Sequence, residues 1–104
     1  MIHKVDENEF EKEVLQAEEL VVVNFNADWC GSCHMLEPIL EELSKENKNV
    51  KFVSINVDNN GSLAQKQGIQ SIPCVVFFKN GQEVNRNIGF MSKSTFEEIL
   101  KESI

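Results

Sequence analysis

Cysteine and long apolar runs are scarce in this sequence. It has three cysteines among 104 residues, an odd number and too few for a fold held together by disulfides, so the usage favours a reducing cytoplasm. No apolar run approaches the roughly 20 residues that span a bilayer. Residues 1–7 lack the apolar segment that a signal peptide needs. We therefore expect a cytoplasmic protein that is neither inserted into a membrane nor exported across one.

Basic residues are also in short supply. Ten lysines and arginines stand against 17 aspartates and glutamates, and the formal net charge is -7. A chain of this sign repels phosphate backbones, and it has no polybasic run for anionic lipids, so we expect no nucleic-acid or membrane partner. The hydrophobic share of 41% is typical of a globular protein. The length suits a single domain over residues 1–104, and we expect a monomer.

Strand-like and helix-like segments alternate along the chain. The expected strands, the first of them weak, cover residues 2–5, 20–25, 50–57, 75–78 and 84–88. Helical periodicity is found at residues 10–15, 31–46 and 59–67, and again around Phe96, Ile99 and Leu100. This alternation predicts an α/β fold, in which a central mixed β-sheet of about five strands is flanked on both faces by about four helices.

Two local patterns predict how elements begin or connect. Ser94 and Glu97 have the spacing of a capping box, which predicts the start of the last helix. Asn80-Gly81 lies between two strand-like runs. Both of these residues tolerate a positive φ, so the dipeptide predicts a tight β-hairpin.

The segment Cys30-Gly31-Ser32-Cys33 lies where a buried strand gives way to the main helix. A helix N-terminus offers unpaired N–H groups and the positive end of the helix dipole, and both stabilise a thiolate. The thiolate is the reactive form of cysteine, whose free thiol has a pKa of about 8.5. A second thiol one turn further on can then attack a mixed disulfide and release the product. The pattern predicts redox chemistry at Cys30 and Cys33.

Several motifs carry a resemblance to a known family. Trp29-Cys30-Gly31-Ser32-Cys33 is similar to Trp-Cys-Gly-Pro-Cys, the signature of the thioredoxin family. Further matches, spread over nearly the whole chain, are Pro38, Ile72-Pro73, Phe78-Lys79-Asn80-Gly81 and Gly89. The resemblance implies a thioredoxin fold with a cis-proline at Pro73. It also implies a thiol–disulfide oxidoreductase that reduces disulfides in target proteins.

The resemblance also assigns roles to residues. It implies that Cys30 is the attacking nucleophile and Cys33 the resolving thiol. The implied substrate-binding residues are Trp29, Gly31, Ser32, Ile72, Pro73 and Gly89. Backbone near Pro73 would pair with an extended target segment. Electrons would come from a thioredoxin reductase, either flavin- and NADPH-dependent or ferredoxin-linked. We expect no metal and no bound cofactor beyond the redox-active Cys30–Cys33 disulfide itself.

The chain departs from the family pattern at several positions. Ser32 stands where proline is usual, and Cys74 where threonine is usual. Asn24 and Ser54 replace a buried aspartate and a nearby lysine, in the region where the family transfers protons. Asn26 occupies the position of a common second tryptophan. The first two changes bear on redox potential, and those at Asn24 and Ser54 bear on proton transfer.

Other interpretations of the cysteines remain open at this point. Cys30-Gly31-Ser32-Cys33-His34 also fits the c-type haem attachment motif C-x-x-C-H. Zinc could recruit Cys30, Cys33, His34 and Cys74, although adjacent ligands make a closed site awkward. The chain could instead be a more oxidising oxidase or isomerase, or a thioredoxin-fold binding subunit.

Two further expectations concern residues near the cysteines. Cys74 is expected to be a buried structural residue, since free cysteine often behaves as a small hydrophobe. Phe90 and Met91 follow Gly89. We expect them to form an exposed aromatic–methionine pair that enlarges the docking surface for targets.

Overall fold

The strands form where apolar and β-branched residues are densest. The computed structural model describes residues 1–104. Its strands are β1 (Ile2–Lys4), β2 (Val21–Asn26), β3 (Lys51–Asn56), β4 (Cys74–Lys79) and β5 (Gln82–Ile88). Its helices are the short π-helical segment η1 (Glu11–Leu15), then α1 (Gly31–Glu46), α2 (Gly61–Lys66) and α3 (Lys93–Ser103). None of these helices is long and apolar enough to cross a membrane.

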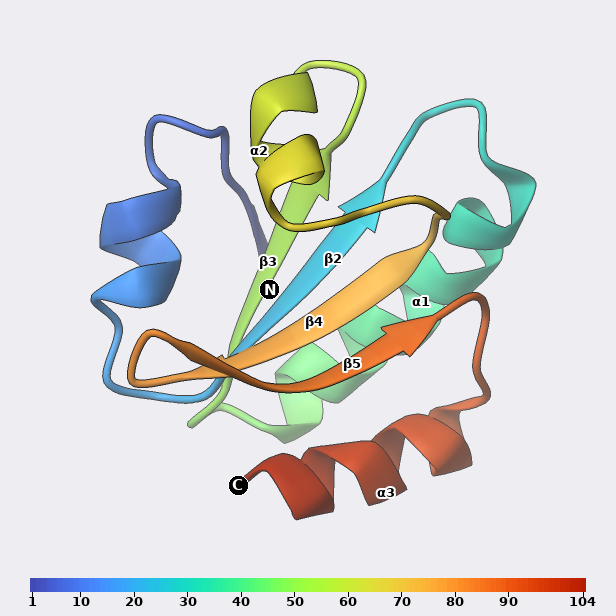
Figure 1. Ribbon diagram of the computed structural model, residues 1–104. Coiled ribbons are helices and arrows are strands. Elements are labelled where there is room, and N and C mark those ends of the chain that lie inside the picture. Colours follow the sequence, from blue (N-terminus) through green and yellow to red (C-terminus); the bar gives the residue numbers. More distant parts are fainter.

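The five strands form one mixed sheet in the order β1-β3-β2-β4-β5 (Figure 1). Strands β1, β3 and β2 are parallel, whereas β4 is antiparallel to β2 and β5 is antiparallel to β4. Each parallel connection needs a crossover, and α1 supplies the one between β2 and β3. The predicted mixed sheet and its four helical segments are therefore confirmed.

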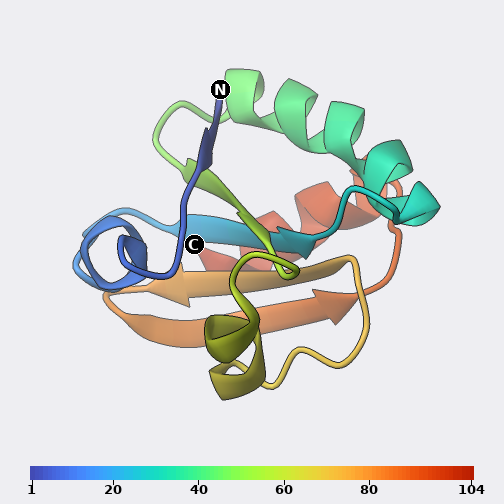
Figure 2. The same cartoon turned by 90° about the horizontal axis from the view of Figure 1, so that it is seen from above.

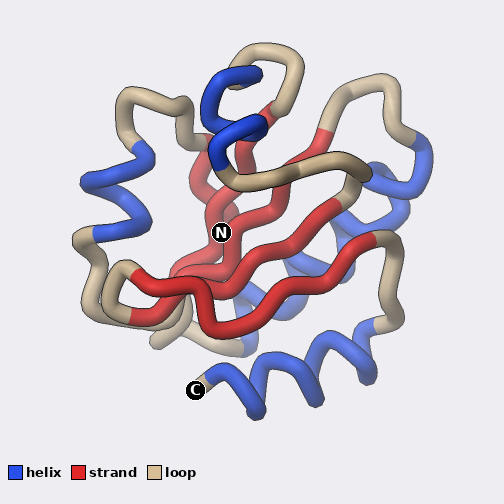
Figure 3. Tube along the Cα trace, viewed as in Figure 1, coloured by secondary structure: helices blue, strands red, loops and turns tan.

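Helices cover both faces of the sheet. Successive side chains along β2 point to opposite faces, so this strand contributes to the hydrophobic core on each face. Val21, Val23 and Phe25 pack in a core on the side of η1 and α2. Val22 packs in a second core with residues of α1 and α3, including Leu36 and Phe96. Figure 2 shows α1 and α2 on opposite sides of the sheet, and Figure 3 shows the helices surrounding it.

The last helix begins earlier than predicted. Ser92 is its N-cap, with a φ of -69°, a ψ of 160° and a hydroxyl that accepts the N–H of Thr95 at 3.3 Å. Ser94 lies inside α3, so the prediction of a Ser94–Glu97 capping box is wrong. A cap needs extended backbone, which Ser92 has and which Ser94, as a helical residue, lacks.

The hairpin between β4 and β5 is confirmed. Asn80 has a φ of 52° and Gly81 one of 79°, and Lys79 pairs with Gln82. Gly81 is held close to η1, since a Cβ on it would lie 2.8 Å from the carbonyl oxygen of Leu15. Further along, Phe78 pairs with Glu83 and Phe77 with Asn85. Val84 is therefore the extra residue of a β-bulge in the edge strand β5.

Candidate functional site

The two signature cysteines occupy the first turn of α1. Strand β2 ends at Asn26, and a short loop leads to Cys30, the N-cap of α1. Cys30 has extended backbone, with a φ of -87° and a ψ of 110°. The N–H of Cys33 donates to the Sγ of Cys30 at 3.2 Å. The sulfur of Cys30 thus takes the place of a capping oxygen, where helix N–H groups favour a thiolate.

Cys30 and Cys33 form a disulfide, with their Cα atoms 5.2 Å apart. Cys30 is 5% exposed and Cys33 is 4% exposed, so exposure does not distinguish the two cysteines in this disulfide form. Both sulfurs lie within the small cluster that also contains Ala27. What distinguishes the two cysteines is position, because only Cys30 caps the helix.

The sulfur of Cys30 has polar neighbours in its own helix and in the loop before β4, and the segment after β5 is bonded to that loop. The hydroxyl of Ser32 lies 3.5 Å from this sulfur, and the carbonyl oxygen of Ile72 lies 3.9 Å from it. The Ile72–Pro73 peptide bond is cis, as the resemblance implied. The N–H of Gly89 donates to the carbonyl of Pro73 at 2.7 Å, and Gly89 has a φ of 93°. The residues before β4 and after β5 are thereby tied together beside the disulfide.

Apolar side chains stand exposed around this point. Trp29 is 71% exposed, and its indole N–H donates to Asp58 at 2.9 Å. Phe90 is 45% exposed. Met91, in contrast, is buried against the core under α1 and α3. The predicted exposed pair is therefore wrong for Met91, since the chain turns it inward just before α3 begins.

The surface at Cys30 is open rather than enclosed. None of the five hollows on the molecule is lined by Cys30 or Cys33. A Cβ on Gly31 would meet no atom within 4 Å. An open surface with exposed apolar side chains suits a protein segment better than a small enclosed substrate.

Asn24 and Ser54 lie side by side in the sheet. They are register partners on β2 and β3. Asn24 is 5% exposed. The side-chain amide of Asn26 donates to the Ser54 hydroxyl at 2.7 Å and to the Asn24 carbonyl at 3.3 Å. Sequence analysis missed this linking role of Asn26, although the spacing of two between Asn24 and Asn26 places both on one face of a strand.

Cys74 and His34 are engaged away from the disulfide. Cys74 is buried in the core on the η1 side, and burial raises the pKa of its thiol. The Nε2 of His34 lies 2.6 Å from the carbonyl oxygen of Asp28. No group of three or more histidine, cysteine, aspartate or glutamate side chains is arranged to hold a metal ion. The expectation that Cys74 is buried is confirmed.

Two cysteines that close a disulfide across one helical turn, with the first sulfur at a helix N-terminus, exchange electrons with other thiols and disulfides. The fold and site thus define a thiol–disulfide oxidoreductase.

Comparison with known proteins supports the same class of protein. The family model described as Thioredoxin matches residues 1–102. The thioredoxin of Rickettsia felis is 41% identical over 100% of both chains. The thioredoxin of Porphyra purpurea is 38% identical over 99% of this chain and 97% of its own.

The chain belongs to the thioredoxin family. It is a protein-disulfide reductase that works through the Cys30–Cys33 pair. Membership also implies that disulfide-containing proteins are its targets and that a reductase usually supplies its electrons.

Proposed function

We propose that Cys30 attacks the target disulfide and that Cys33 resolves the product. The Cys30 thiolate forms a bond to one target sulfur, and the other target sulfur leaves as a thiolate and takes up a proton. Cys33 then loses its proton and attacks Cys30. The Cys30–Cys33 disulfide forms, and the second target thiol is released. Two electrons pass from the dithiol to the target. The hydrogen bond from the Cys33 N–H to the sulfur of Cys30 supports this assignment.

The target docks on the open surface around Cys30. Its proposed contacts are Trp29, Gly31, Ser32, Ile72, Pro73 and Gly89. The exposure of Trp29, the space above Gly31 and the nearness of the Ile72 carbonyl to Cys30 support these contacts. Since the surface is open, an extended target segment can lie beside the Ile72–Pro73 bond and pair with its backbone.

A thioredoxin reductase, flavin- and NADPH-dependent or ferredoxin-linked, is the proposed electron donor. The chain acts as a monomer, in the cytoplasm, without a bound cofactor or metal. The small number of cysteines suits a reducing compartment.

Trapping and labelling test the roles of the two cysteines. Limiting iodoacetamide added to the reduced protein should alkylate Cys30 before Cys33 and Cys74. The Cys33→Ser variant should accumulate mixed disulfides with target proteins, whereas Cys30→Ser should accumulate none. Preferential labelling of Cys33 would reverse the assignment.

One observation favours a second candidate, a more oxidising oxidase or isomerase. The Ser32 hydroxyl lies 3.5 Å from the sulfur of Cys30 and can donate to its thiolate. Stabilising the reduced form raises the reduction potential. Equilibration with glutathione buffers separates the candidates. A potential near that of cytosolic reductants supports the reductase, and a much more oxidising value supports the oxidase or isomerase. Insulin reduction with dithiothreitol separates both from a binding subunit, which would give no turnover.

A further inference from the structure

Arg86 of β5 makes contacts that the exchange of electrons at the two cysteines does not use. Its Nη2 donates to the backbone carbonyl of Gln67 at 2.8 Å. Its Nε and Nη2 also donate to the two carboxylate oxygens of Glu83, each at 2.9 Å. Two parallel bonds of this kind fix the orientation of a guanidinium. Arg86 therefore holds a charged donor against a single backbone carbonyl group, that of Gln67.

The β-bulge at Val84 makes this arrangement possible. Residues three apart on a regular strand point to opposite faces of the sheet. Here Glu83 pairs with Phe78 of β4, and Arg86 pairs with Val76. Both of these β4 residues pack in the core on the side of η1 and α2. Directly opposed residues of an antiparallel pair share a face, so Glu83 and Arg86 lie together on the α2 side of the sheet.

The carbonyl group that Arg86 reaches lies at the end of α2. Gln67 is the C-cap of this helix, and Gly68 follows it with a φ of 69°. The N–H of Ile69 then donates back to the carbonyl of Ala64 at 2.9 Å. Carbonyl groups at a helix C-terminus favour a cation, which also meets the negative end of the helix dipole. Arg86 thus fixes, from β5, the point where the chain leaves α2.

The segment that leaves α2 is the 68–73 loop, and it leads directly to the site. It ends at the cis bond between Ile72 and Pro73, where the carbonyl oxygen of Ile72 lies 3.9 Å from the sulfur of Cys30. At this end the N–H of Gly89, the residue after β5, donates to the carbonyl of Pro73 at 2.7 Å. Strand β5 and the residue that follows it therefore hold both ends of the loop.

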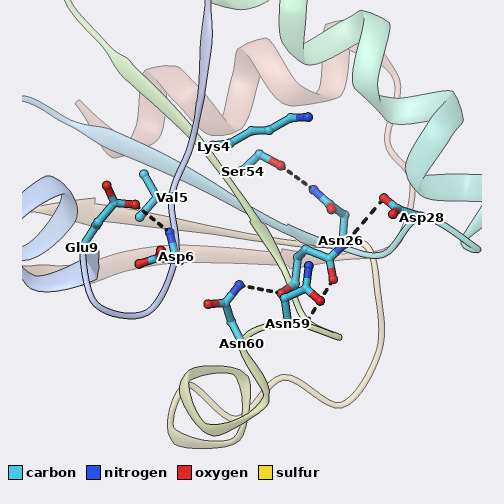
Figure 4. Close-up of a pocket in the computed structure, with 10 residues that line it drawn as sticks. Lys4, Val5, Asp6, Glu9, Asn26, Asp28, Ser54, Asn59 and Asn60 are labelled. Carbon is cyan, nitrogen blue, oxygen red and sulfur yellow. Dashed lines mark hydrogen bonds between the residues drawn. The ribbon is translucent and has the colours of Figure 1, made fainter.

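The opposite flank of the site is anchored by β3 rather than by β5. The side-chain amide of Asn56, at the end of β3, donates to the Asp28 carboxylate at 3.5 Å. Just beyond β3, Asp58 accepts the indole N–H of Trp29. Figure 4 shows Asp28 with the asparagine side chains near it. A change at Arg86 should therefore loosen the 68–73 loop and leave the segment that carries Trp29 in place.

We propose that Arg86 is a positioning residue for target binding, which holds the 68–73 loop in the shape that receives an extended target segment. The inference rests on the proposed docking of targets beside this loop. The backbone N–H groups of residues 70–72 donate to no other backbone group, so they are available to a target. A loop that is already ordered lowers the entropy cost of binding, whereas each target must order a loose one. Arg86 acts on the target through the carbonyl of Gln67, without a contact to the reacting sulfurs.

Arg86→Met tests this role, because methionine keeps much of the apolar chain and removes the guanidinium. Lys51→Met is the matched control. Lys51 also donates to a carboxylate and to a backbone carbonyl, both of Glu13, but it ties β3 to η1 and not to the 68–73 loop. Each variant reduces two substrates, namely insulin, with dithiothreitol as the electron source, and an aromatic disulfide whose thiolate is coloured. The second substrate has no backbone that could pair with the loop.

We expect Arg86→Met to raise the KM for insulin by about fivefold, since each target must now order the loop. The kcat for insulin and the rate with the aromatic disulfide should both stay within about twofold of the original protein, because the loop takes no part in the chemical step. Lys51→Met should lower the melting temperature without changing either substrate's kinetics. In hydrogen exchange, the amide of Ile69 should exchange faster in Arg86→Met alone.

Two further variants separate the possible failures. Glu83→Gln keeps the guanidinium and its bond to Gln67, so its KM for insulin should stay near that of the original protein. Ile72→Ala probes the docking itself and should raise this KM. A raised KM in Ile72→Ala beside an unchanged KM in Arg86→Met would overturn the role of Arg86 alone, as would an equal rise in Lys51→Met or Glu83→Gln. An unchanged KM in both Ile72→Ala and Arg86→Met would also overturn the docking of targets at this loop.

Discussion

Ser32 places a hydroxyl 3.5 Å from the sulfur of Cys30, at a position where the family usually has proline. Its hydrogen bond favours the thiolate and so the reduced form. We predict that Ser32→Pro shifts the potential of the pair to more negative values by roughly 30 mV, equivalent to about 1.4 kcal/mol. Proline also suits the first turn of a helix and rigidifies it. Equilibration with glutathione measures the shift.

Ser32→Ala is the matched control, because it removes the hydroxyl without adding the proline ring. A shift of similar size in both variants assigns the effect to the hydrogen bond. A shift in Ser32→Pro alone assigns it to the stiffened turn. A potential that is unchanged or rises in Ser32→Pro contradicts both explanations.

Because the side chain of Asn24 is neutral, the fold avoids the desolvation penalty of a buried carboxylate at this position. We predict that Asn24→Asp destabilises the fold at pH 8 by about 1–3 kcal/mol relative to pH 4. Desolvation raises the folded-state pKa of a buried acid above its unfolded value. The destabilisation is therefore absent at low pH and grows as pH rises past the unfolded pKa. Urea unfolding at the two pH values measures it. Equal effects at both would mean that the carboxylate is solvated or paired in the fold.

At the scale of elements, the contact between the β4–β5 turn and η1 limits which residue can occupy position 81. Gly81 has a φ of 79°, and a Cβ there would lie 2.8 Å from the backbone of Leu15. We predict that Gly81→Ala costs about 2 kcal/mol or more, from a disfavoured φ together with a backbone clash. Gly61→Ala is the control, since a Cβ there meets nothing within 4 Å. In the first turn of α2 it should be neutral or stabilising by up to about 1 kcal/mol. Thermal unfolding compares the two, and equal losses would contradict the clash.

Lys51 ties β3 to η1 through Glu13. Its Nζ lies 2.8 Å from the Glu13 carboxylate and 2.8 Å from the Glu13 carbonyl oxygen. The hydrogen bond and charge of Lys51 lower the pKa of Glu13 below 4.5. A lowered folded pKa contributes stability that is complete above the unfolded pKa and is lost as pH falls below it.

We therefore predict that Glu13→Gln lowers the melting temperature slightly at pH 7 and reduces the loss on acidification from about pH 5 to pH 3. Glu18→Gln, an exposed residue in the next loop, is the control and should leave the acid response unchanged. Parallel acid responses of Glu13→Gln and the original chain would show that the pair adds nothing to stability.

The sequence predicted the presence of the helices and strands better than it predicted where they end and which residues they contact. The buried strands and the Asn80-Gly81 hairpin depend on local hydrophobicity and on φ preferences, both of which are visible in the residues. The choice of Ser92 over Ser94 as a cap depends on where packing ends the loop before α3. The inward turn of Met91 depends on the space between α1 and α3. Neither is encoded in spacing alone.

The functional site likewise has features that follow from sequence motifs and features that depend on tertiary packing. Cys30, Cys33 and the cis bond at Pro73 follow from motifs, but the similar burial of the two sulfurs comes from tertiary packing. The bond from Asn26 to Ser54 depends on the register of β2 against β3. That pairing of distant segments cannot be read from either segment alone.

For the whole molecule, the net charge of -7 implies self-repulsion. We predict that the melting temperature rises by a few degrees between about 10 mM and 150 mM salt, as the screening length falls from about 30 Å to about 8 Å. Lys93 opposes this repulsion locally, because it bridges Glu42 and Glu46 of α1 from α3. Lys93→Met should therefore be most destabilising at low salt. A melting temperature that falls with salt would mean that ion pairs outweigh the repulsion.

The bulge at Val84 affects how the protein behaves at high concentration. Strand β5 is an edge of the sheet, and a straight edge offers its free N–H and C=O groups to any passing strand. The extra residue bends the strand and increases its local twist, so a second molecule cannot continue the ladder in register. Arg86 and Glu83, paired at 2.9 Å, add charges to the same strand. The molecule therefore carries its own protection against growing into a fibre, although its sheet remains open on that side.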